Sequence, residues 1–286
     1  MAPSKVFLVG AGPGDPGLIS VRGLELLRDA DVVLYDALAH PALREACRPD
    51  ADLRNVGKRF GEPSSAQEAI NAELVALARA GKSVVRLKGG DPLLFARGGE
   101  EALALVEAGI EFEIVPAASS PIGAAAYAGI PLTHRELSSS VTFITGSDRA
   151  GVPWSPESWR KLATATDTIC VLMGMRRIDE ICAALVEGGR NPLTPAAVIQ
   201  WGARANQRVV TGTLADIGAL SHAAALTNPS IIVIGEVVRL RETLAWYEKK
   251  PLFAKRLLVP RPSGQAARTA KAIRERGGEP LVMPLI

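Results

Sequence analysis

The length, composition and charge of the chain exclude several classes of protein. Its 286 residues are 48% hydrophobic and carry a formal net charge of +3, which suits one or two apolar cores and does not demand a nucleic acid partner. Three cysteines neither pair evenly nor have metal-ligand spacing, so we expect reduced thiols and no metal site. No signal-like segment opens the sequence and no run of about 18 apolar residues occurs, so we expect a cytoplasmic protein without a membrane partner.

The first expected strand, residues 5–9, runs into a turn rich in glycine and proline at residues 10–17, and then into a helix. Such a turn invites a dinucleotide-binding interpretation. The G-x-G-x-x-G fingerprint would, however, require glycine where Asp15 stands, and Pro13 lacks an amide hydrogen that could bind phosphate. The turn therefore favours a ligand that does not present a pyrophosphate.

The second expected strand, residues 31–36, ends on Asp36, and another strand at 53–56 leads into the cations Lys58 and Arg59. The carboxyl ends of parallel strands meet at one edge of a sheet, which is where open α/β folds bind ligands. We therefore expect the carboxylate and the two cations to lie at the same edge as the glycine-rich turn.

The stretch at residues 84–92 combines a strand, a glycine pair and a carboxylate. Its apolar run is interrupted by Arg86 and Lys88 and ends in a Gly-Gly-Asp turn at 89–91. Glycine at a strand end lets a ligand approach the backbone, whereas an acid at the tip of the turn repels phosphate. The two cations alternate along the strand and so share one face of the sheet.

The mixture of acids and cations at the predicted edge indicates the chemistry of its ligands. Carboxylates and main-chain groups beside glycine suit a cofactor with ribose hydroxyls and a positive centre, which indicates a sulfonium. The surplus of cations suits a polyanionic acceptor, since the arginine fork matches carboxylates well. The candidate substrate-binding residues are Arg59, Arg86, Lys88, Arg97 and Arg135.

The order of strands and helices predicts an α/β protein with two lobes. Strands alternate with helical segments as far as Tyr127, which indicates a parallel sheet, and residues 130–136 read as a linker. Later strands, at 196–199 and 207–211 for example, are closer together and favour a mixed sheet with antiparallel pairs. We therefore expect an N-terminal lobe at residues 1–136 and a C-terminal lobe at 137–247.

The composition changes after the second lobe. A charged break with a proline at 248–251 leads to a strand, a helix and a second strand, which are too little to bury a core of their own. We expect residues 248–286 to be a linker and the truncated start of a further domain.

Several motifs together give the sequence a family resemblance. They occupy residues 9–16, 30–36, 56–59, 86–92, 97–101 and 126–135, with continuations at 173–174, 202, 211–214 and 235–238. These motifs resemble those of the uroporphyrinogen-III C-methyltransferases within the tetrapyrrole methylase family, over about residues 5 to 247. The segment from Lys255 is similar to the opening of uroporphyrinogen-III synthase.

The resemblance implies a fold, an activity and a set of partners. The fold is the two-lobed tetrapyrrole methylase fold, with the cofactor cleft between the lobes, in a homodimer. The implied donor is S-adenosyl-methionine, which leaves S-adenosyl-homocysteine as product. The implied reaction is two successive C-methylations of uroporphyrinogen III, through precorrin-1 to precorrin-2, feeding sirohaem and cobalamin synthesis.

The resemblance also implies roles for individual residues. Asp36 takes the proton-acceptor position and Lys58 the proton-donor position. The cofactor contacts fall on Pro13, Gly89, Gly90, Asp91, Leu94, Ser119, Ser120, Met173 and Gly202.

Three other functions remain open at this point. A methylase of the same fold could act on another tetrapyrrole or on ribosomal RNA. A nicotinamide-dependent oxidoreductase is disfavoured because Asp15 interrupts the fingerprint. A non-catalytic tetrapyrrole carrier is separated from an enzyme only by assay. The three histidines are scattered and lack an evident nucleophile, which disfavours a hydrolase.

Overall fold

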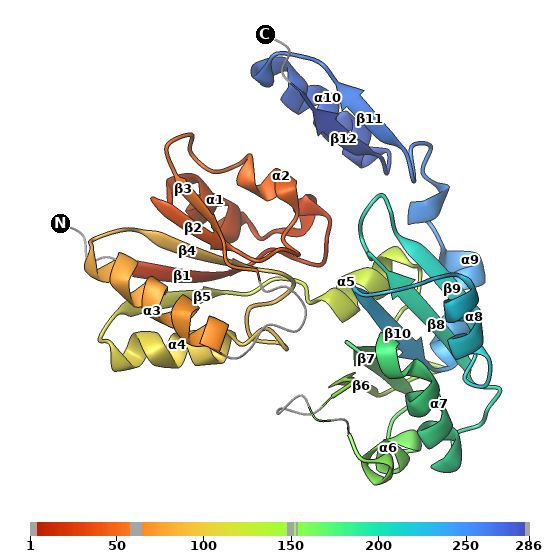
Figure 1. The fold of residues 1–286 in the computed structure, drawn as a ribbon. Helices are drawn as coiled ribbons and strands as arrows, with labels where there is room; N and C mark the ends of the chain where they lie inside the picture. The colour runs from red at the N-terminus through yellow and green to blue at the C-terminus, as the bar shows by residue number, and fades with distance from the viewer. Residues whose placement is uncertain (1–4, 58–64, 148–151, 153, 284–286) are drawn as a thin grey trace. The chain divides into compact units, whose positions relative to one another are not determined.

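The computed structural model describes residues 5–57, 65–147, 152 and 154–283 (Figure 1). They belong to two compact units, Met1–Ser120 and Pro121–Ile286. Helix α5 (Ser120–Tyr127) packs its alanines against the sheet of the second unit, so the boundary between the units lies at the start of this helix. The sequence placed the boundary later, at residue 136, because the proline-containing stretch after α5 reads as a linker.

The first unit is built on a sheet of five parallel strands in the order β3-β2-β4-β1-β5. The strands are β1 (Lys5–Gly10), β2 (Val32–Tyr35), β3 (Asp52–Asn55), β4 (Val84–Lys88) and β5 (Glu111–Val115). The helices are η1 (Pro16–Leu18), α1 (Val21–Asp29), α2 (Pro41–Arg44), α3 (Ser65–Arg79) and α4 (Gly98–Glu107). The predicted parallel α/β sheet is therefore confirmed.

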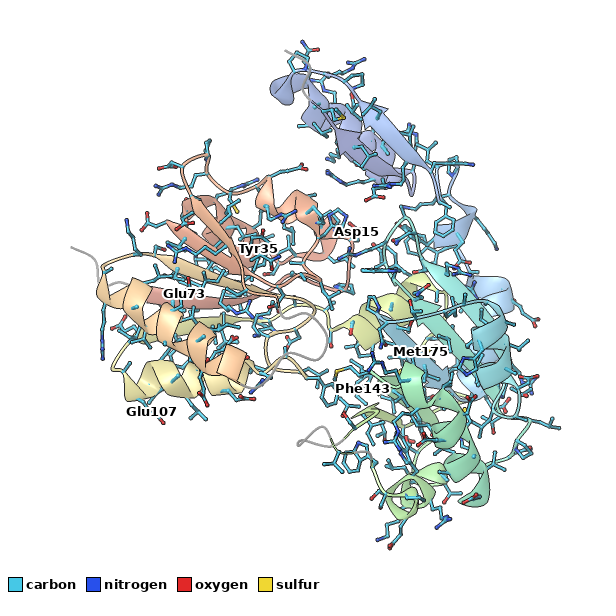
Figure 2. All side chains as sticks on the ribbon, in the orientation of Figure 1. Asp15, Tyr35, Glu73, Glu107, Phe143 and Met175 are labelled. Carbon is cyan, nitrogen blue, oxygen red and sulfur yellow. The ribbon has the colours of Figure 1, made fainter. Side chains whose placement is uncertain are left out.

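Helices cover both faces of this sheet, and the alternation of side chains along the strands explains how. Val33 and Val85 point to the core beneath α1 and α2, whereas Leu34 and Val84 point to the core beneath α3 and α4. Tyr35, labelled in Figure 2, packs against the first of these layers, and the guanidinium of Arg44 from α2 lies 4.8 Å from its ring centre. Such double coverage requires strands that are apolar on both faces.

The second unit contains a mixed sheet of five strands in the order β6-β7-β10-β8-β9, as the close spacing of its strands predicted. Only β6 and β7 pair in parallel; the other neighbours are antiparallel. The strands are β6 (Val141–Thr145), β7 (Thr168–Leu172), β8 (Pro195–Gln200), β9 (Arg208–Thr213) and β10 (Ser230–Ile234).

Helices also cover both faces of the mixed sheet. One face packs against α6 (Pro156–Ala163), α7 (Ile178–Glu187) and α8 (Ile217–Ala223), and the other against α5 and η3 (Glu236–Leu240) (Figure 1). Helix α6 was not predicted from the sequence, although Ser155 and Pro156 form a recognisable start: the Ser155 hydroxyl accepts the amide hydrogen of Ser158. The short helices η2 (Met175–Arg177), α9 (Arg241–Leu244) and η4 (Tyr247–Lys249) complete the unit as far as residue 249.

The last segment forms the expected strand-helix-strand unit. Strands β11 (Arg256–Val259) and β12 (Glu279–Val282) pair in parallel, and α10 (Ser263–Glu275) connects them. Its apolar cluster is small, centred on Val259, Ala266 and Ile273. The similarity of this segment to the opening of a uroporphyrinogen-III synthase stays a prediction. Among the described residues, no helix has the length and apolar character needed to cross a membrane.

Candidate functional site

The loops that follow β1 and β4 are hydrogen-bonded to each other at the carboxyl edge of the parallel sheet. The Gly12 amide donates to the Gly90 carbonyl (3.2 Å), and the Gly90 amide donates to the Gly12 carbonyl (2.9 Å). Both glycines have positive φ, +77° and +69°, where other residues are strained. The two glycine motifs recognised separately in the sequence therefore form one structure.

Asp91 joins the loop after β4 to the loop after β5. Its Oδ1 accepts the amide hydrogens of Leu93 (2.8 Å) and Leu94 (3.1 Å), and its Oδ2 accepts that of Ala117 (3.2 Å). A Cβ on Gly90 would lie 3.4 Å from the amide nitrogen of Ser120, so this loop reaches the start of α5. The predicted cofactor contacts brought together here are Gly89, Gly90, Asp91, Leu94, Ser119 and Ser120.

The glycine-rich turn after β1 holds the remaining predicted cofactor contact of this unit. Pro13 is half-buried within it. Asp15, labelled in Figure 2, accepts the amide hydrogen of Gly17 through Oδ1 (2.8 Å) and so caps η1. The acid that interrupts the dinucleotide fingerprint thus shapes the turn in which it lies.

Asp36 lies where the edge of the sheet meets the glycine loop, as the sequence predicted from its position after β2. Its amide donates to the Leu87 carbonyl (3.0 Å), which fixes the backbone beside β4. Oδ1 accepts a hydrogen bond from Nη2 of Arg86 (2.5 Å), and Oδ2 accepts a long one from the Gly89 amide (3.4 Å). The carboxylate therefore contacts a cation on one side and a predicted cofactor-binding loop on the other.

Arg86 and Lys88 lie inside the unit, beneath α4. They are 2% and 1% exposed, and both contact Oε1 of the fully buried Glu101, through Nε of Arg86 (3.1 Å) and Nζ of Lys88 (2.8 Å). The sequence correctly placed both on one face of β4. Their burial, however, argues against direct contact with substrate carboxylates, contrary to the prediction made from the sequence.

Burial and neighbouring charges shift the pKa values of both buried cations. Burial, together with the like charge of Arg86, lowers the pKa of Lys88, and Glu101 and Asp36 only partly oppose this shift. Burial also disfavours the charged form of Arg86, but Asp36 and Glu101 outweigh it and raise the pKa of the guanidinium. The two carboxylates thus favour the charged forms of Arg86 and Lys88.

Glu101 belongs to the motif at residues 97–101, from which no role for it is predicted. The spacing of Gly98, Glu101 and Leu105 nevertheless indicates that Glu101 is buried. These three residues recur at helical spacing and are the buried residues of α4. An acid on the buried stripe of a helix needs a buried cation. Gln67 of α3, which donates to Oε1 of Glu101 (3.1 Å), could not be identified from sequence in this way.

Lys58 and Arg59 lie outside the described residues. Their neighbour in sequence, Gly57, is placed against the backbone beside Asp36: a Cβ on Gly57 would lie 2.2 Å from the amide nitrogen of Ala37. Only glycine allows the chain to pass this point.

The other predicted residues are dispersed. Arg97 directly precedes α4, with φ of 59°, and pairs with Glu100 at the surface (2.8 Å from Nε to Oε1). In the second unit, Arg135 is exposed, and Met173, which is 57% exposed, follows β7 with φ of 55°. Gly202, after β8, packs so closely on α5 that a Cβ there would lie 2.2 Å from the Cβ of Ala124.

This edge of the sheet offers main-chain groups at glycine and ordered carboxylates. Backbone without side chains admits close approach of a ligand, and carboxylates accept hydrogen bonds from hydroxyls and attract a positive centre. Within the described ranges, no three histidine, cysteine or acidic side chains are grouped so that they could hold a metal ion.

Comparisons with known proteins agree on one family. The family model described as Tetrapyrrole (Corrin/Porphyrin) Methylases matches residues 5–218. The siroheme synthase of Pseudomonas putida (strain W619) is 50% identical over 244 residues, which are 85% of this chain and 52% of that protein. The chain thus spans about half the length of the curated relatives it matches.

Two solved structures from Thermus thermophilus are also similar. A uroporphyrin-III-C-methyltransferase has 40% sequence identity and a TM-score of 0.70, with 85% of this chain and 97% of that chain covered. A uroporphyrin-III C-methyltransferase in complex with S-adenyl homocysteine has 35% identity and a TM-score of 0.71, with 83% and 100% covered.

The buried charges give a prediction for stability. Replacing Glu101 by alanine leaves Arg86 and Lys88 buried without their shared acceptor, and we expect a loss of about 3–5 kcal/mol in the free energy of unfolding. The adjacent Glu100→Ala variant removes an exposed pair and should lose at most about 1 kcal/mol. Urea unfolding followed by circular dichroism measures both, and equal losses would contradict the prediction.

Proposed function

Because the chain belongs to the tetrapyrrole methylase family, we propose that it transfers methyl groups from S-adenosyl-methionine to two ring carbons of uroporphyrinogen III. The first transfer gives precorrin-1 and the second precorrin-2, the precursor of sirohaem and cobalamin. The observation that carries the proposal is the pairing of Gly12 with Gly90 beside the carboxylate of Asp36. The names of the relatives and of the Thermus structures support it.

The residues at this edge fit a sulfonium cofactor, which supplies an electrophilic methyl group when bound. Gly89 and Gly90 present backbone without side chains to a ligand, and the loops contain acids where a dinucleotide would need bare amides. Pro13 belongs to the loop after β1 and Leu94 to the loop after β4. Met173 and Gly202 are proposed contacts from the second unit, on the strength of the resemblance.

Asp36 acts in this proposal as the proton acceptor. Methyl transfer to an electron-rich pyrrole carbon depends mainly on positioning, and the macrocycle then sheds a proton. Asp36 is 28% exposed in its side chain, so a proton on a bound ligand can reach it. A positioned general base of this kind contributes about 10² to 10⁴ in rate.

Lys58 is proposed as the proton donor or as an anchor for an acetate or propionate arm. It directly follows Gly57, which lies against Ala37, and Ala37 directly follows Asp36. The close approach of Gly57 and Ala37 supports a site that Lys58 and Asp36 share. Arg59, Arg97 and Arg135 are the remaining candidates for binding the carboxylates of the substrate.

We further propose that the protein is a homodimer, as its resemblance to the family implies. Light scattering coupled to gel filtration should then give twice the chain mass of 30.1 kDa. A mass equal to that of one chain at micromolar concentration would refute the dimer. Its cytoplasmic location stays a prediction.

The proposed activity is tested by anaerobic incubation with uroporphyrinogen III and methyl-labelled S-adenosyl-methionine. We expect label in the macrocycle at up to two methyl groups per molecule, identified by mass spectrometry. Binding of both ligands without transfer would instead establish a carrier.

Asp36→Asn should lower turnover by about 10² to 10⁴, because an amide keeps the size of the side chain but cannot accept the proton. The dissociation constant for S-adenosyl-homocysteine should stay unchanged. Asp50→Asn is the matched control. Asp50 also pairs with an arginine (2.6 Å from Arg48), but it precedes β3 at the opposite, amino edge of the sheet. Full activity in Asp36→Asn would exclude its role as base.

Gly90→Ala should weaken the binding of S-adenosyl-homocysteine about tenfold, measured by isothermal titration calorimetry, since a methyl group enters the proposed cofactor loop. Gly81→Ala is the matched control, because Gly81 also has positive φ (+79°) but nothing lies within 4 Å of its added Cβ. Both variants should lose about 1 kcal/mol of stability from backbone strain. Equal affinities in the two variants would contradict a cofactor contact at Gly90.

A further inference from the structure

The buried charges beneath α4 have no part in the reaction as proposed so far. Two cations, Arg86 and Lys88, are enclosed with the carboxylates of Glu101 and Asp36, and only Asp36 extends to the surface. The cluster occupies the end of β4 next to the glycine loop. On the same face, at the start of β4, Val84 packs in an apolar core without charges.

Stability alone is a poor reason for such a cluster. Removing charged groups from water is costly, and buried ion pairs can often be replaced by apolar residues with no loss of stability. Here Glu101 makes its three hydrogen bonds through Oε1, while its buried Oε2 has no hydrogen-bond partner in the described part of the chain. The cost of burying these charges therefore indicates a use for them other than stability.

The geometry of Arg86 indicates that use. Its Nη1 donates to the carbonyls of Leu34 and Leu87 (3.3 Å each), and its Nε donates to Glu101, so three contacts fix the plane of the guanidinium. The remaining nitrogen, Nη2, is then directed at Oδ1 of Asp36. A planar fork held in this way determines the orientation of the carboxylate it contacts.

The two oxygens of Asp36 are therefore not equivalent. Oδ1 is held by Arg86 at 2.5 Å, whereas Oδ2 has a longer contact, with the Gly89 amide at 3.4 Å. Gly89 belongs to the loop proposed to bind the cofactor. The oxygen with the weaker protein contact is thus the one beside the proposed methyl donor.

We propose that Arg86, anchored by Glu101, is a positioning residue that orients Asp36 so that Oδ2 accepts the proton. This proposal rests on the proposed function, since it takes Asp36 as the base. Lys88 donates its hydrogen bond to Glu101 on the interior side of the cluster, so its part is to neutralise the buried charge.

A double-mutant cycle of Arg86→Lys and Asp36→Asn tests the coupling. Lysine keeps the charge but cannot contact Asp36, Glu101 and the two carbonyls together. We expect kcat to fall about tenfold or more in Arg86→Lys, with KM for the tetrapyrrole unchanged, and to change less than about twofold when Arg86→Lys is added to Asp36→Asn. An equal loss in both backgrounds would overturn the proposal.

Arg241→Lys is the matched control for the loss of an ion-paired, partly buried arginine. Arg241 pairs with Glu248 (2.6 Å) and donates to the Ala128 carbonyl in the second unit. Any effect of this change on kcat should be the same in the unaltered protein and in the Asp36→Asn variant. Glu101→Gln, which keeps the shape of the side chain, replaces Arg86→Lys in the cycle if that variant does not fold.

A crystallographic comparison tests the positioning without reference to activity. In the unaltered protein we expect the contact between Arg86 and Oδ1 of Asp36, and in Arg86→Lys or Glu101→Gln we expect the carboxylate to rotate. An unchanged carboxylate in both variants would overturn the proposal. Absence of methyl transfer by the unaltered protein would instead refute the proposed function, which the crystal structures do not test.

Discussion

The ion cluster around Arg86 connects the interior of the first unit to its proposed site. The guanidinium links a helix on one side of the sheet, through Glu101, to the end of β2, through Asp36. Such a link is possible only where β2 and β4 are adjacent and parallel, so that Leu34 and Arg86 share a register position. The sheet order and the charge cluster therefore support each other.

The glycine loops depend on the same sheet order. Because β1 lies directly beside β4, the loops that leave them run together, and Gly12 and Gly90 exchange hydrogen bonds. Asp91 then fixes the next loop along the sheet through Ala117. Residues from three separate stretches of sequence thus form one continuous edge of main-chain groups, which agrees with ligand binding at the carboxyl ends of the strands.

Family membership and the geometry of the site give different information about the chain. The family match covers residues 5–218, so it includes the first sheet and most of the second but not β11, α10 and β12. The description of the family names tetrapyrroles, a class of molecule that the geometry of one sheet edge does not specify. The geometry in turn distinguishes exposed cations such as Arg97 from buried ones such as Arg86, a difference that similarity of sequence does not reveal.

The sequence by itself determined the strands of both sheets, the parallel character of the first and the position of Asp36 at its edge. These follow from local patterns: apolar runs, their spacing and the glycines that end them. The shared face of Arg86 and Lys88 was equally predictable, since side chains alternate along any strand. Short helices such as α6 were not predicted from the sequence, because too few residues show the helical spacing of apolar side chains.

Only the tertiary structure decided what those two cations contact. Whether a charged residue at a strand end faces a ligand or a helix depends on which helix covers that face, and here α4 supplies Glu101. The boundary between the units was decided in the same way, by the packing of α5 on the second sheet. Both outcomes depend on contacts between segments distant in sequence, which no local pattern encodes.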